Sequence, residues 1–165
     1  MKKKNKKIVV AVSGGFDPVH VGHVRLFREA KKLGDELVVI LNNDNWLKRK
    51  KGFVFMPQAE RKEIIGAIRF VDRVVFSGHS VRFTDRSVCA ELKNIRPDIF
   101  ANGGDRTVQD AKKKNSSLNP EADLCRKLGI KMVFNVGRGG KMQSSSWLLE
   151  RFLRSKLNKN YNAKH

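Results

Sequence analysis

The sequence predicts an α/β protein, a Rossmann-like three-layer sandwich built on a five-stranded parallel sheet. Short apolar runs, rich in β-branched residues, alternate along the chain with segments whose apolar residues recur every three or four positions. A glycine-rich turn follows the first and the fourth of these runs. With the strand order 3-2-1-4-5, the two turns lie side by side where the order reverses, and sheets of this kind bind their ligands there.

The first βαβ unit opens the chain. Residues 8–12 form a short, continuous apolar run, which is typical of a buried parallel strand. A glycine-rich loop follows at 13–23, and apolar residues at helical spacing then lead to Gly34, which ends the helix. Residues 37–41 give the second strand, and such a crossover is right-handed.

The remaining elements follow from the same patterns. We expect a polar loop over 42–46 and a mobile, polar excursion over 110–117. The other expected elements are a helix over 58–68, a strand over 73–76, a helix capped by Thr84 or Asp85 that Pro97 ends, a strand over 99–101, a helix capped by Asn119 that runs to Gly129, a strand over 131–135 and a last helix that starts at 144–146.

Length and charge define the broad class of protein. A chain of 165 residues with 40% hydrophobic residues fits one folded domain, which we place at 8–157, between a basic N-terminal tail at 1–7 and a C-terminal tail at 158–165. The formal net charge of +19 is high, and part of it lies in the runs 48–51 and 112–114. Such a balance attracts anions, which include nucleotides, sugar phosphates and nucleic acid.

The same composition bears on compartment. No apolar run approaches the length of about 20 residues that a membrane helix needs, and the lysine-rich N-terminus lacks the apolar region of a signal peptide. Cys89 and Cys125 fall in helical patterns and are expected to be buried free thiols, with a disulfide as the open alternative. We therefore expect a cytoplasmic protein that does not enter a membrane.

The loop at 13–23 has the features of a phosphate-binding site. Its glycines allow a tight turn that leaves backbone N–H groups open, and Gly22 lets a bulky anion lie against the backbone. His20 and His23 are three residues apart and share one face of a starting helix. Two histidines at this spacing also suit zinc, but no Cys or third His lies nearby. The pattern therefore favours a polyphosphate over a metal.

A second phosphate site is predicted at the start of the last helix. Ser144, Ser145 and Ser146 open that helix, so their hydroxyl and N–H groups can hold the β- and γ-phosphates of a nucleotide. An ordinary helix cap is the alternative. Arg138 and Lys141 lie just before the serines and favour phosphate.

These groups suit one kind of reaction. If the polyphosphate is a nucleoside triphosphate, a phosphate oxygen of a second substrate can attack its α-phosphorus and release pyrophosphate. A phosphate monoester is already nucleophilic, so the protein needs positive charge, in-line positioning and hydrogen-bond donors rather than a strong base. The sequence contains no pattern typical of a Ser-His-Asp or Cys-His catalytic set.

The loop at 13–23 resembles the G-x-F-D-x-x-H-x-G-H signature of the cytidylyltransferase-like nucleotidyltransferases. Other stretches extend the resemblance over nearly the whole chain. Residues 42–44 with 48–52 are similar to the N-S-D…K-R-x-K-G stretch of the heptose 1-phosphate adenylyltransferase domain, and 102–105 to its K-G-G-D turn. Residues 60–62 with 68–72 match the E-x-R and I-R-x-V-D run that this domain shares with glycerol-3-phosphate cytidylyltransferase.

The resemblance implies transfer of CMP or AMP from a nucleoside triphosphate to a phosphorylated sugar or polyol, with Mg²⁺ as cofactor, and a homodimer is common in the family. The catalytic candidates are His20, His23, Lys48 and Lys51. The nucleotide-binding candidates are Gly14, Gly15, Phe16, Asp17, Gly22, Gly104, Asp105, Arg138, Ser144, Ser145 and Ser146. The acceptor-binding candidates are Asn43, Asp44 and Arg61. For Asp17, tuning of a histidine, contact with the metal and a structural turn carboxylate are alternatives; for Arg61 the alternative is a surface position.

Other interpretations stay open. The signature also resembles that of the nicotinate mononucleotide adenylyltransferases, and 20–23 with 141–144 are similar to motifs of class I aminoacyl-tRNA synthetases, although the chain lacks room for an anticodon domain. A module that binds nucleotide without turnover, or that binds nucleic acid, is a further alternative; no RNA-recognition motif is present, so we do not expect nucleic acid as the partner. Met142-Gln143, Arg106 and the longer loop at 112–120 depart from the family pattern, which leaves both base and acceptor open.

Overall fold

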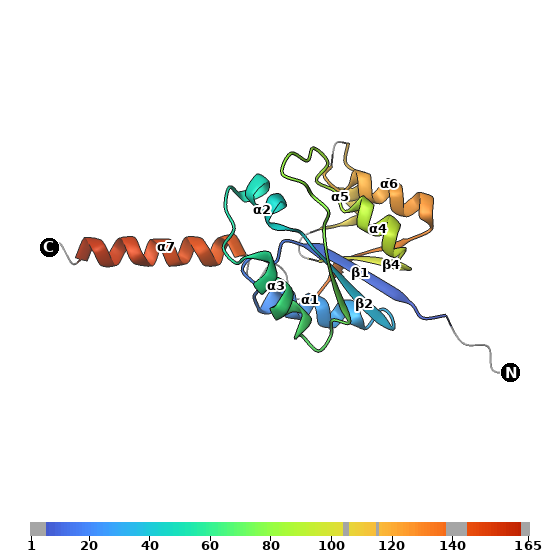
Figure 1. Ribbon diagram of the computed structural model, residues 1–165, viewed down its shortest axis with the longest axis horizontal. Coiled ribbons are helices and arrows are strands. Elements are labelled where there is room, and N and C mark those ends of the chain that lie inside the picture. Colours follow the sequence, from blue (N-terminus) through green and yellow to red (C-terminus); the bar gives the residue numbers. More distant parts are fainter. Residues whose placement is uncertain (1–5, 104–105, 115, 138–144, 163–165) are drawn as a thin grey trace.

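The computed structural model describes residues 6–103, 106–114, 116–137 and 145–162 of the chain. The sheet in this part of the chain is parallel and has the order β3-β2-β1-β4-β5, which confirms the predicted fold class and strand order (Figure 1). The elements are β1 (Val9–Gly14), α1 (Val21–Lys31), β2 (Glu36–Leu41), α2 (Asp44–Lys51), α3 (Gln58–Gly66), β3 (Arg73–Phe76), α4 (Cys89–Ile95), β4 (Ile99–Gly103), α5 (Val108–Lys112), α6 (Asn119–Leu128), β5 (Lys131–Val136) and α7 (Ser145–Asn162).

Helices cover both faces of the sheet because the strands are apolar on both sides. Val10 and Val12 of β1 pack with Phe27 of α1 and Ile65 of α3 in one buried cluster. Ala11, between the two valines, packs into the other cluster, which includes residues of α4 and α6. Side chains alternate between the faces of a strand, so a continuous apolar run supplies both clusters at once. The result is the expected three-layer arrangement.

The main error of the sequence analysis is the segment after β2. We predicted a polar loop over 42–46, but α2 begins at Asp44. Asn43 caps this helix, because its side-chain oxygen accepts a hydrogen bond from the N–H of Trp46 at 3.0 Å. Gly52, with φ of 83°, ends it in the left-handed conformation that favours glycine. Leu47 is the one fully buried residue of α2, so the helix carries too little apolar periodicity to be recognised.

Three smaller differences concern helix starts. Helix α5, over Val108–Lys112, extends into the stretch predicted as an excursion over 110–117. Neither Thr84 nor Asp85 caps α4, which starts at Cys89; the Asp85 carboxylate instead accepts hydrogen bonds from the N–H and the hydroxyl of Ser87. Asn119 is the first residue of α6 rather than its cap.

The last helix, α7, projects away from the sheet and its covering helices in Figure 1. The predicted boundary between residues 157 and 158 falls inside it. Trp147, Phe152 and Leu153 on α7 are between 45% and 59% exposed. Among the described residues, no helix has both the length and the apolar character required to cross a membrane.

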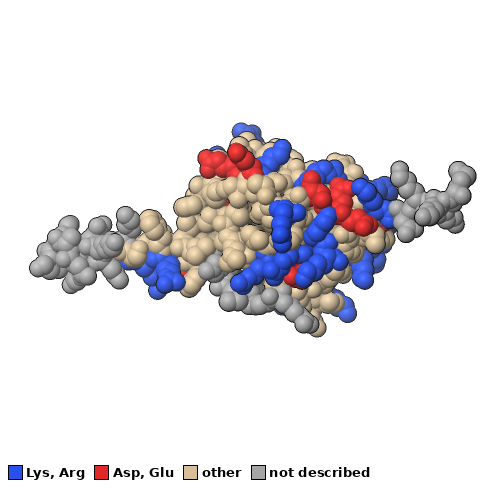
Figure 2. Space-filling view, turned by 90° about the horizontal axis from the view of Figure 1, so that it is seen from below, with Lys and Arg blue, Asp and Glu red and all other residues tan. Residues whose placement is uncertain are grey.

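The high positive charge is visible on the surface. Figure 2 shows many Lys and Arg side chains gathered on the side of the molecule that faces down in Figure 1, with Asp and Glu among them. Helix α1 contributes several of the ion pairs that the structure forms: Arg28 and Lys32 both pair with Glu29, and Lys31 pairs with Asp72. Part of the positive charge is therefore compensated locally.

Candidate active site

Two glycines of the loop between β1 and α1 are required by close packing. A Cβ added to Gly14 would lie 2.8 Å from the ring of Phe16, and one added to Gly15 would lie 2.7 Å from Cδ2 of Leu47 in α2. Neither glycine has a positive φ; in this loop it is Phe16 that has one, at 47°. We predicted that these glycines serve the turn through conformational freedom. In the structure they are needed for a different reason: Gly14 leaves room for the Phe16 ring, and Gly15 leaves room for Leu47 of α2.

Phe16 and Asp17 both point into the protein. The Phe16 side chain is 6% exposed and meets the ring of His23 edge-on, with 4.9 Å between centroids. Asp17 is 0% exposed, and its two carboxylate oxygens accept the N–H groups of Phe55 and Met56 at 2.9 and 2.7 Å. We predicted both as nucleotide-binding residues. Both side chains are thus enclosed by the protein, and for Asp17 the two backbone contacts favour the structural turn carboxylate among its alternatives.

His20 and His23 form a reciprocal cap at the start of α1. Nδ1 of His20 accepts the N–H of Gly22 at 3.1 Å, and Nδ1 of His23 accepts the N–H of His20 at 3.2 Å. The two rings stack, with 3.7 Å between centroids. Because each Nδ1 is an acceptor, the hydrogen of each neutral ring is on Nε2. The pair therefore presents two Nε2–H donors side by side, while the N–H of Gly22 is engaged by His20.

Both imidazoles are neutral near pH 7. Burial, the His20 ring and the Lys51 ammonium together lower the pKa of His23 from 6.5 to about 3. Burial and Lys51 also lower the pKa of His20. The histidines can therefore donate hydrogen bonds to phosphate oxygens, but the positive charge of the site has to come from other residues.

Lys51 is the cation that the structure brings to the histidines. Its Nζ donates to the backbone oxygen of Asp17 at 2.9 Å, and its charge acts on both imidazoles. Lys48, the other lysine we predicted, has an exposed side chain, and its backbone oxygen accepts the N–H of Gly52 at the end of α2. The structure thus distinguishes two lysines that the sequence left equivalent.

The start of α7 lies against the same loop, although it is more than 120 residues away in sequence. Ser145 is 9% exposed, and its hydroxyl donates to the backbone oxygen of Pro18 at 3.0 Å. The ends of β4 and β5 approach α1 from another side: Cβ atoms added to Gly103 and Gly137 would lie 2.7 and 3.2 Å from atoms of Leu26. Three segments that are distant in the sequence therefore converge on the first two turns of α1.

Some predicted residues fall outside the described part of the chain. These are Gly104, Asp105, Arg138 and Ser144, and of Ser146 only the helical backbone is described. The described neighbours Gly103, Gly137 and Ser145 all lie next to α1 or the loop before it.

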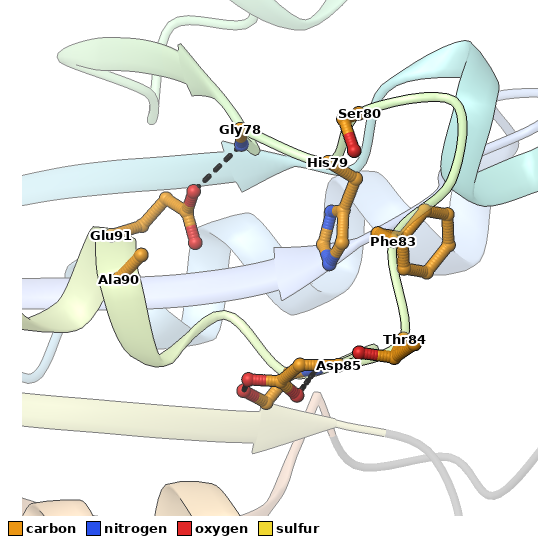
Figure 3. A pocket seen from close by; sticks show the side chains of 9 residues that line it. Gly78, His79, Ser80, Phe83, Thr84, Asp85, Ala90 and Glu91 are labelled. Carbon is orange, nitrogen blue, oxygen red and sulfur yellow. Dashed lines mark hydrogen bonds between the residues drawn. The ribbon is translucent and has the colours of Figure 1, made fainter.

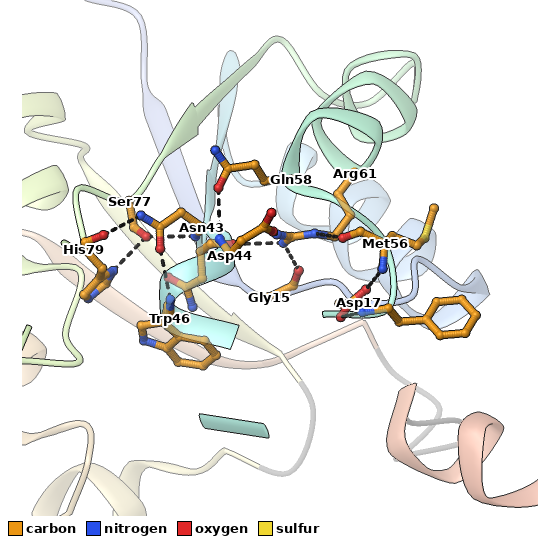
Figure 4. A network of polar contacts seen from close by, with 12 residues as sticks. Gly15, Asp17, Asn43, Asp44, Trp46, Met56, Gln58, Arg61, Ser77 and His79 are labelled. Atoms are coloured by element: carbon orange, nitrogen blue, oxygen red, sulfur yellow. Dashed lines mark hydrogen bonds and ion pairs between the residues drawn. The ribbon is translucent and has the colours of Figure 1, made fainter. Parts of the chain in front are cut away.

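Arg61 is the centre of a buried polar network, shown in Figure 4. Its side chain is 0% exposed. Nη1 donates to the backbone oxygens of Gly15 and Asn42 at 2.6 and 2.9 Å, and Nε donates to that of Met56 at 2.9 Å. Nη2 pairs with the carboxylate of Asp44 at 2.6 Å. Four of its five N–H donors therefore have acceptors within the protein, so Arg61 is not the surface arginine that we considered, and its contacts favour a structural role over acceptor binding.

Asn43 and Asp44 belong to the same network. Besides capping α2, Asn43 donates from Nδ2 to the backbone oxygen of His79 at 2.7 Å. Asp44 pairs with Arg61, and its N–H donates to Gln58 at 2.9 Å. The polar groups of these two predicted acceptor-binding residues are thus engaged in joining α2, α3 and the segment after β3.

Sequence reasoning missed the importance of Trp46 and Lys50. The Trp46 indole N–H donates to the backbone oxygen of Arg86 at 3.0 Å, and the Lys50 ammonium lies 4.5 Å from the ring centroid. Burial lowers the pKa of Lys50, and the charges of Arg106, Lys51 and Arg86 lower it further, so these cations lie near one another. Lys50 is exposed, and the sequence showed it within a basic run but gave no sign of its contact with the Trp46 ring.

This geometry can be compared with known proteins. A family model described as cytidylyltransferase-like matches residues 11–133, from β1 to β5. The chain belongs to this family. Within it, the chain is 37% identical to FAD synthase of Pyrococcus horikoshii over 125 residues, which are 74% of this chain and 81% of that protein. It is 34% identical to the bifunctional protein HldE of Koribacter versatilis over 108 residues, which are 64% of this chain but 21% of HldE.

A solved structure is similar as well. The lipopolysaccharide core biosynthesis protein of Thermoplasma volcanium aligns with a TM-score of 0.59 and 30% identity, over 81% of this chain and all of that one. The family model confirms the family that the signature at 13–23 resembles. The similar solved structure confirms the Rossmann-like fold.

The Arg61 network yields a stability prediction. Arg61→Ala leaves the Asp44 carboxylate and three backbone oxygens without their donor, so we expect the free energy of unfolding to fall by roughly 3–5 kcal/mol. Lys62→Ala, at the exposed neighbouring position, is the matched control and should cost less than about 1 kcal/mol. Urea denaturation of both variants measures this. If Arg61→Ala were as stable as the control variant but bound phosphate more weakly, Arg61 would be a substrate-binding residue and not a structural one.

The buried histidine yields a pH prediction. Between pH 6.5 and about 3 the unfolded chain binds a proton at His23 that the folded chain does not, so stability is lost as the pH falls. The slope from this residue is about 1.4 kcal/mol per pH unit. His23→Asn keeps an acceptor near the position of Nδ1 but does not titrate, so its stability should fall less between pH 6.5 and 5. Parallel curves for the two proteins in urea denaturation would contradict the assignment.

Proposed function

We propose that the chain transfers a nucleoside monophosphate from a nucleoside triphosphate to a phosphorylated acceptor and releases pyrophosphate. The observation that carries this proposal is the stacked pair of neutral histidines, with Lys51 on one side and the start of α7 on the other. This set supplies paired donors and a cation but no nucleophile of its own. It suits a reaction in which both substrates bring phosphate oxygens.

In the proposed reaction, an oxygen of the acceptor phosphate forms a bond to the α-phosphorus, and the bond between that phosphorus and the oxygen bridging to the β-phosphate breaks. The electron pair of the broken bond leaves with pyrophosphate. The Nε2–H groups of His20 and His23 donate to the oxygens on which negative charge develops, and Lys51 balances that charge. Ser145 and its neighbours hold the triphosphate tail.

The acceptor is proposed to be a phosphorylated sugar or polyol, with CTP or ATP as donor. A second candidate is AMP transfer to FMN, which the similarity to FAD synthases favours. FMN carries its phosphate on a ribityl chain, so it is itself a polyol phosphate with an aromatic ring attached. The two candidates thus require the same chemistry at the phosphate and differ in what lies beyond it.

Magnesium is proposed to enter with the nucleotide. Among the described residues, no group of three or more His, Cys, Asp or Glu side chains could hold a metal ion. Asp17 is enclosed and its two oxygens accept backbone N–H groups, so it does not suit this role. Mg²⁺ commonly binds through substrate phosphates and water, and it would offset the charge of the triphosphate in this way.

A homodimer stays part of the proposal, because α7 extends from the body with exposed apolar side chains such as Phe152 and Leu153. Sedimentation equilibrium of the purified chain tests it: a mass of one chain at all accessible concentrations would exclude the dimer.

The direct test of the function is a pyrophosphate assay. The chain is incubated with Mg²⁺, one nucleoside triphosphate and one of a panel of sugar phosphates, polyol phosphates, FMN and nicotinate mononucleotide. We expect release with ATP or CTP and at least one polyol-bearing phosphate, and loss of release with EDTA. Release with nicotinate mononucleotide alone would establish the dinucleotide alternative. Absence of release with every pair, together with salt-sensitive RNA binding, would establish a binding module.

The two lysines that the structure distinguishes give a matched pair of variants. Lys51→Ala removes the cation beside the histidines, so we expect kcat to fall about 100-fold. Lys48→Ala, three residues earlier in the same helix, should leave kcat within about 2-fold of the wild type. Pyrophosphate release by both variants at saturating substrates measures this. If kcat fell equally in the two variants, the positive charge would come from the basic run at 48–51 as a whole and not from Lys51 in particular.

A further inference from the structure

A cavity of about 330 Å³ lies beside the segment that leads from β3 to α4, residues 77–88. Because β1, β2 and β3 are parallel, this segment leaves the sheet at the same edge as the histidine loop. Its lining includes the side chains of His79, Asp85 and Glu91 (Figure 3). None of them takes part in the reaction proposed above.

The segment around the cavity is held firmly in place. The backbone oxygen of His79 accepts hydrogen bonds from the side-chain amides of Asn43 and Asn45 at 2.7 and 3.0 Å. At the other end, the backbone oxygen of Arg86 accepts the indole N–H of Trp46. Helix α2 therefore links the cavity to the loop that carries the histidines, and the cavity is preformed.

The hydrogen-bond network assigns the proton on His79. The Ser77 hydroxyl is buried; its oxygen accepts the N–H of Asn43 at 3.1 Å and lies 2.7 Å from Nδ1 of His79. The hydroxyl hydrogen needs an acceptor, and Nδ1 supplies it. With Nδ1 as an acceptor, the N–H of the His79 ring is on Nε2. In Figure 3 this end of the ring points into the cavity, toward the space between Asp85 and Glu91.

The opposite wall provides acceptors. One oxygen of Glu91 accepts the N–H of Gly78 at 2.7 Å, and the two oxygens of Asp85 each accept one hydrogen bond from Ser87. A carboxylate has about four lone-pair sites, so both groups can accept more. A donor thus faces two acceptors across a space large enough for a small organic group.

This arrangement selects a class of ligand. Two carboxylates disfavour an anion, in contrast to the positive charge of the chain as a whole. An ammonium group would suit the carboxylates but has no lone pair for the Nε2–H of His79. A hydroxyl group meets both requirements, because its oxygen accepts from Nε2–H while its hydrogen is donated to a carboxylate.

We infer that this cavity binds the hydroxyl-bearing chain of the phosphorylated acceptor, with His79 as its specificity-determining residue. The inference rests on the proposed function for the acceptor phosphate, which would lie at His20, His23 and Lys51. The polyhydroxyl chain of a free sugar or polyol phosphate and the ribityl chain of FMN share this chemistry, and the experiment has to separate them.

Steady-state kinetics with His79→Phe and His79→Gln test the inference. Phe keeps the ring shape but lacks the donor, so we expect the KM for the acceptor to rise about 10-fold while the KM for the nucleotide is unchanged. Gln places an amide N–H near the position of Nε2 and should recover most of the loss. Val81→Ala is the control, because Val81 lies in the same segment, is 80% exposed and does not line the cavity. Thermal denaturation verifies that each variant is folded.

Equal increases in both KM values, or no difference between Phe and Gln, would overturn the inference. Comparison of ribitol 5-phosphate with FMN as acceptor separates the two sources of the hydroxyl chain. An effect of His79→Phe on either one supports the cavity as its binding site.

A binding measurement keeps the inference independent of turnover. The chain has four histidines, so the imidazole nitrogen signals in an NMR spectrum can be assigned with the His79 variants. We expect ribitol 5-phosphate or FMN to shift the His79 signal, and inorganic phosphate to leave it unchanged, even if no pyrophosphate is released. A shift with inorganic phosphate, or none with either acceptor, would overturn the inference while leaving the pyrophosphate assay to decide the proposed function.

Discussion

The guanidinium of Arg61 lies where four segments meet, and the geometry of the site depends on it. Its hydrogen bonds reach the loop after β1, the residue after β2, the first turn of α2 and the segment just before α3. A fully buried charge is tolerated only when its donors are satisfied, so these segments are held at fixed distances from one another. One consequence is that Lys51, at the end of α2, reaches the backbone of Asp17 beside the histidines.

The histidine pair illustrates how helix capping and chemistry use the same atoms. Nδ1 of each ring is engaged with the backbone at the start of α1, which fixes both the orientation and the tautomer. Burial beside Lys51 then keeps the rings neutral. A rigid, neutral donor costs little reorganisation when charge develops on a phosphate, whereas a protonated pair at 3.7 Å would repel itself. The sequence identified the histidines and Lys51 as candidates, but the neutral state of the rings depends on burial, which the sequence alone does not show.

How far the sequence predicts the structure depends on the range of the interactions. The strands and their order follow from apolar runs and glycine turns, because burial on both faces leaves a clear pattern. Helix α2 was missed because it buries one leucine and is capped by Asn43, a residue also favoured in loops. The role of Arg61 could not be predicted, since three of its acceptors are backbone oxygens and backbone positions have no signature in the sequence. For the same reason Lys48 and Lys51 were indistinguishable.

The candidate site and the cavity at His79 differ in charge. Lys51 and the two Nε2–H donors give the candidate site a donor-rich, positive character, whereas Asp85 and Glu91 make the cavity rich in acceptors. If a single ligand spans both, its anionic end is drawn to one side and its neutral, hydroxyl-bearing end to the other, so the charge pattern itself fixes the direction of binding. Helix α2 joins the two regions through Asn43 and Lys51, so its position decides whether they can act on one ligand. In the proposed reaction, the orientation of the acceptor would therefore depend on α2, the segment that the sequence analysis described as a loop.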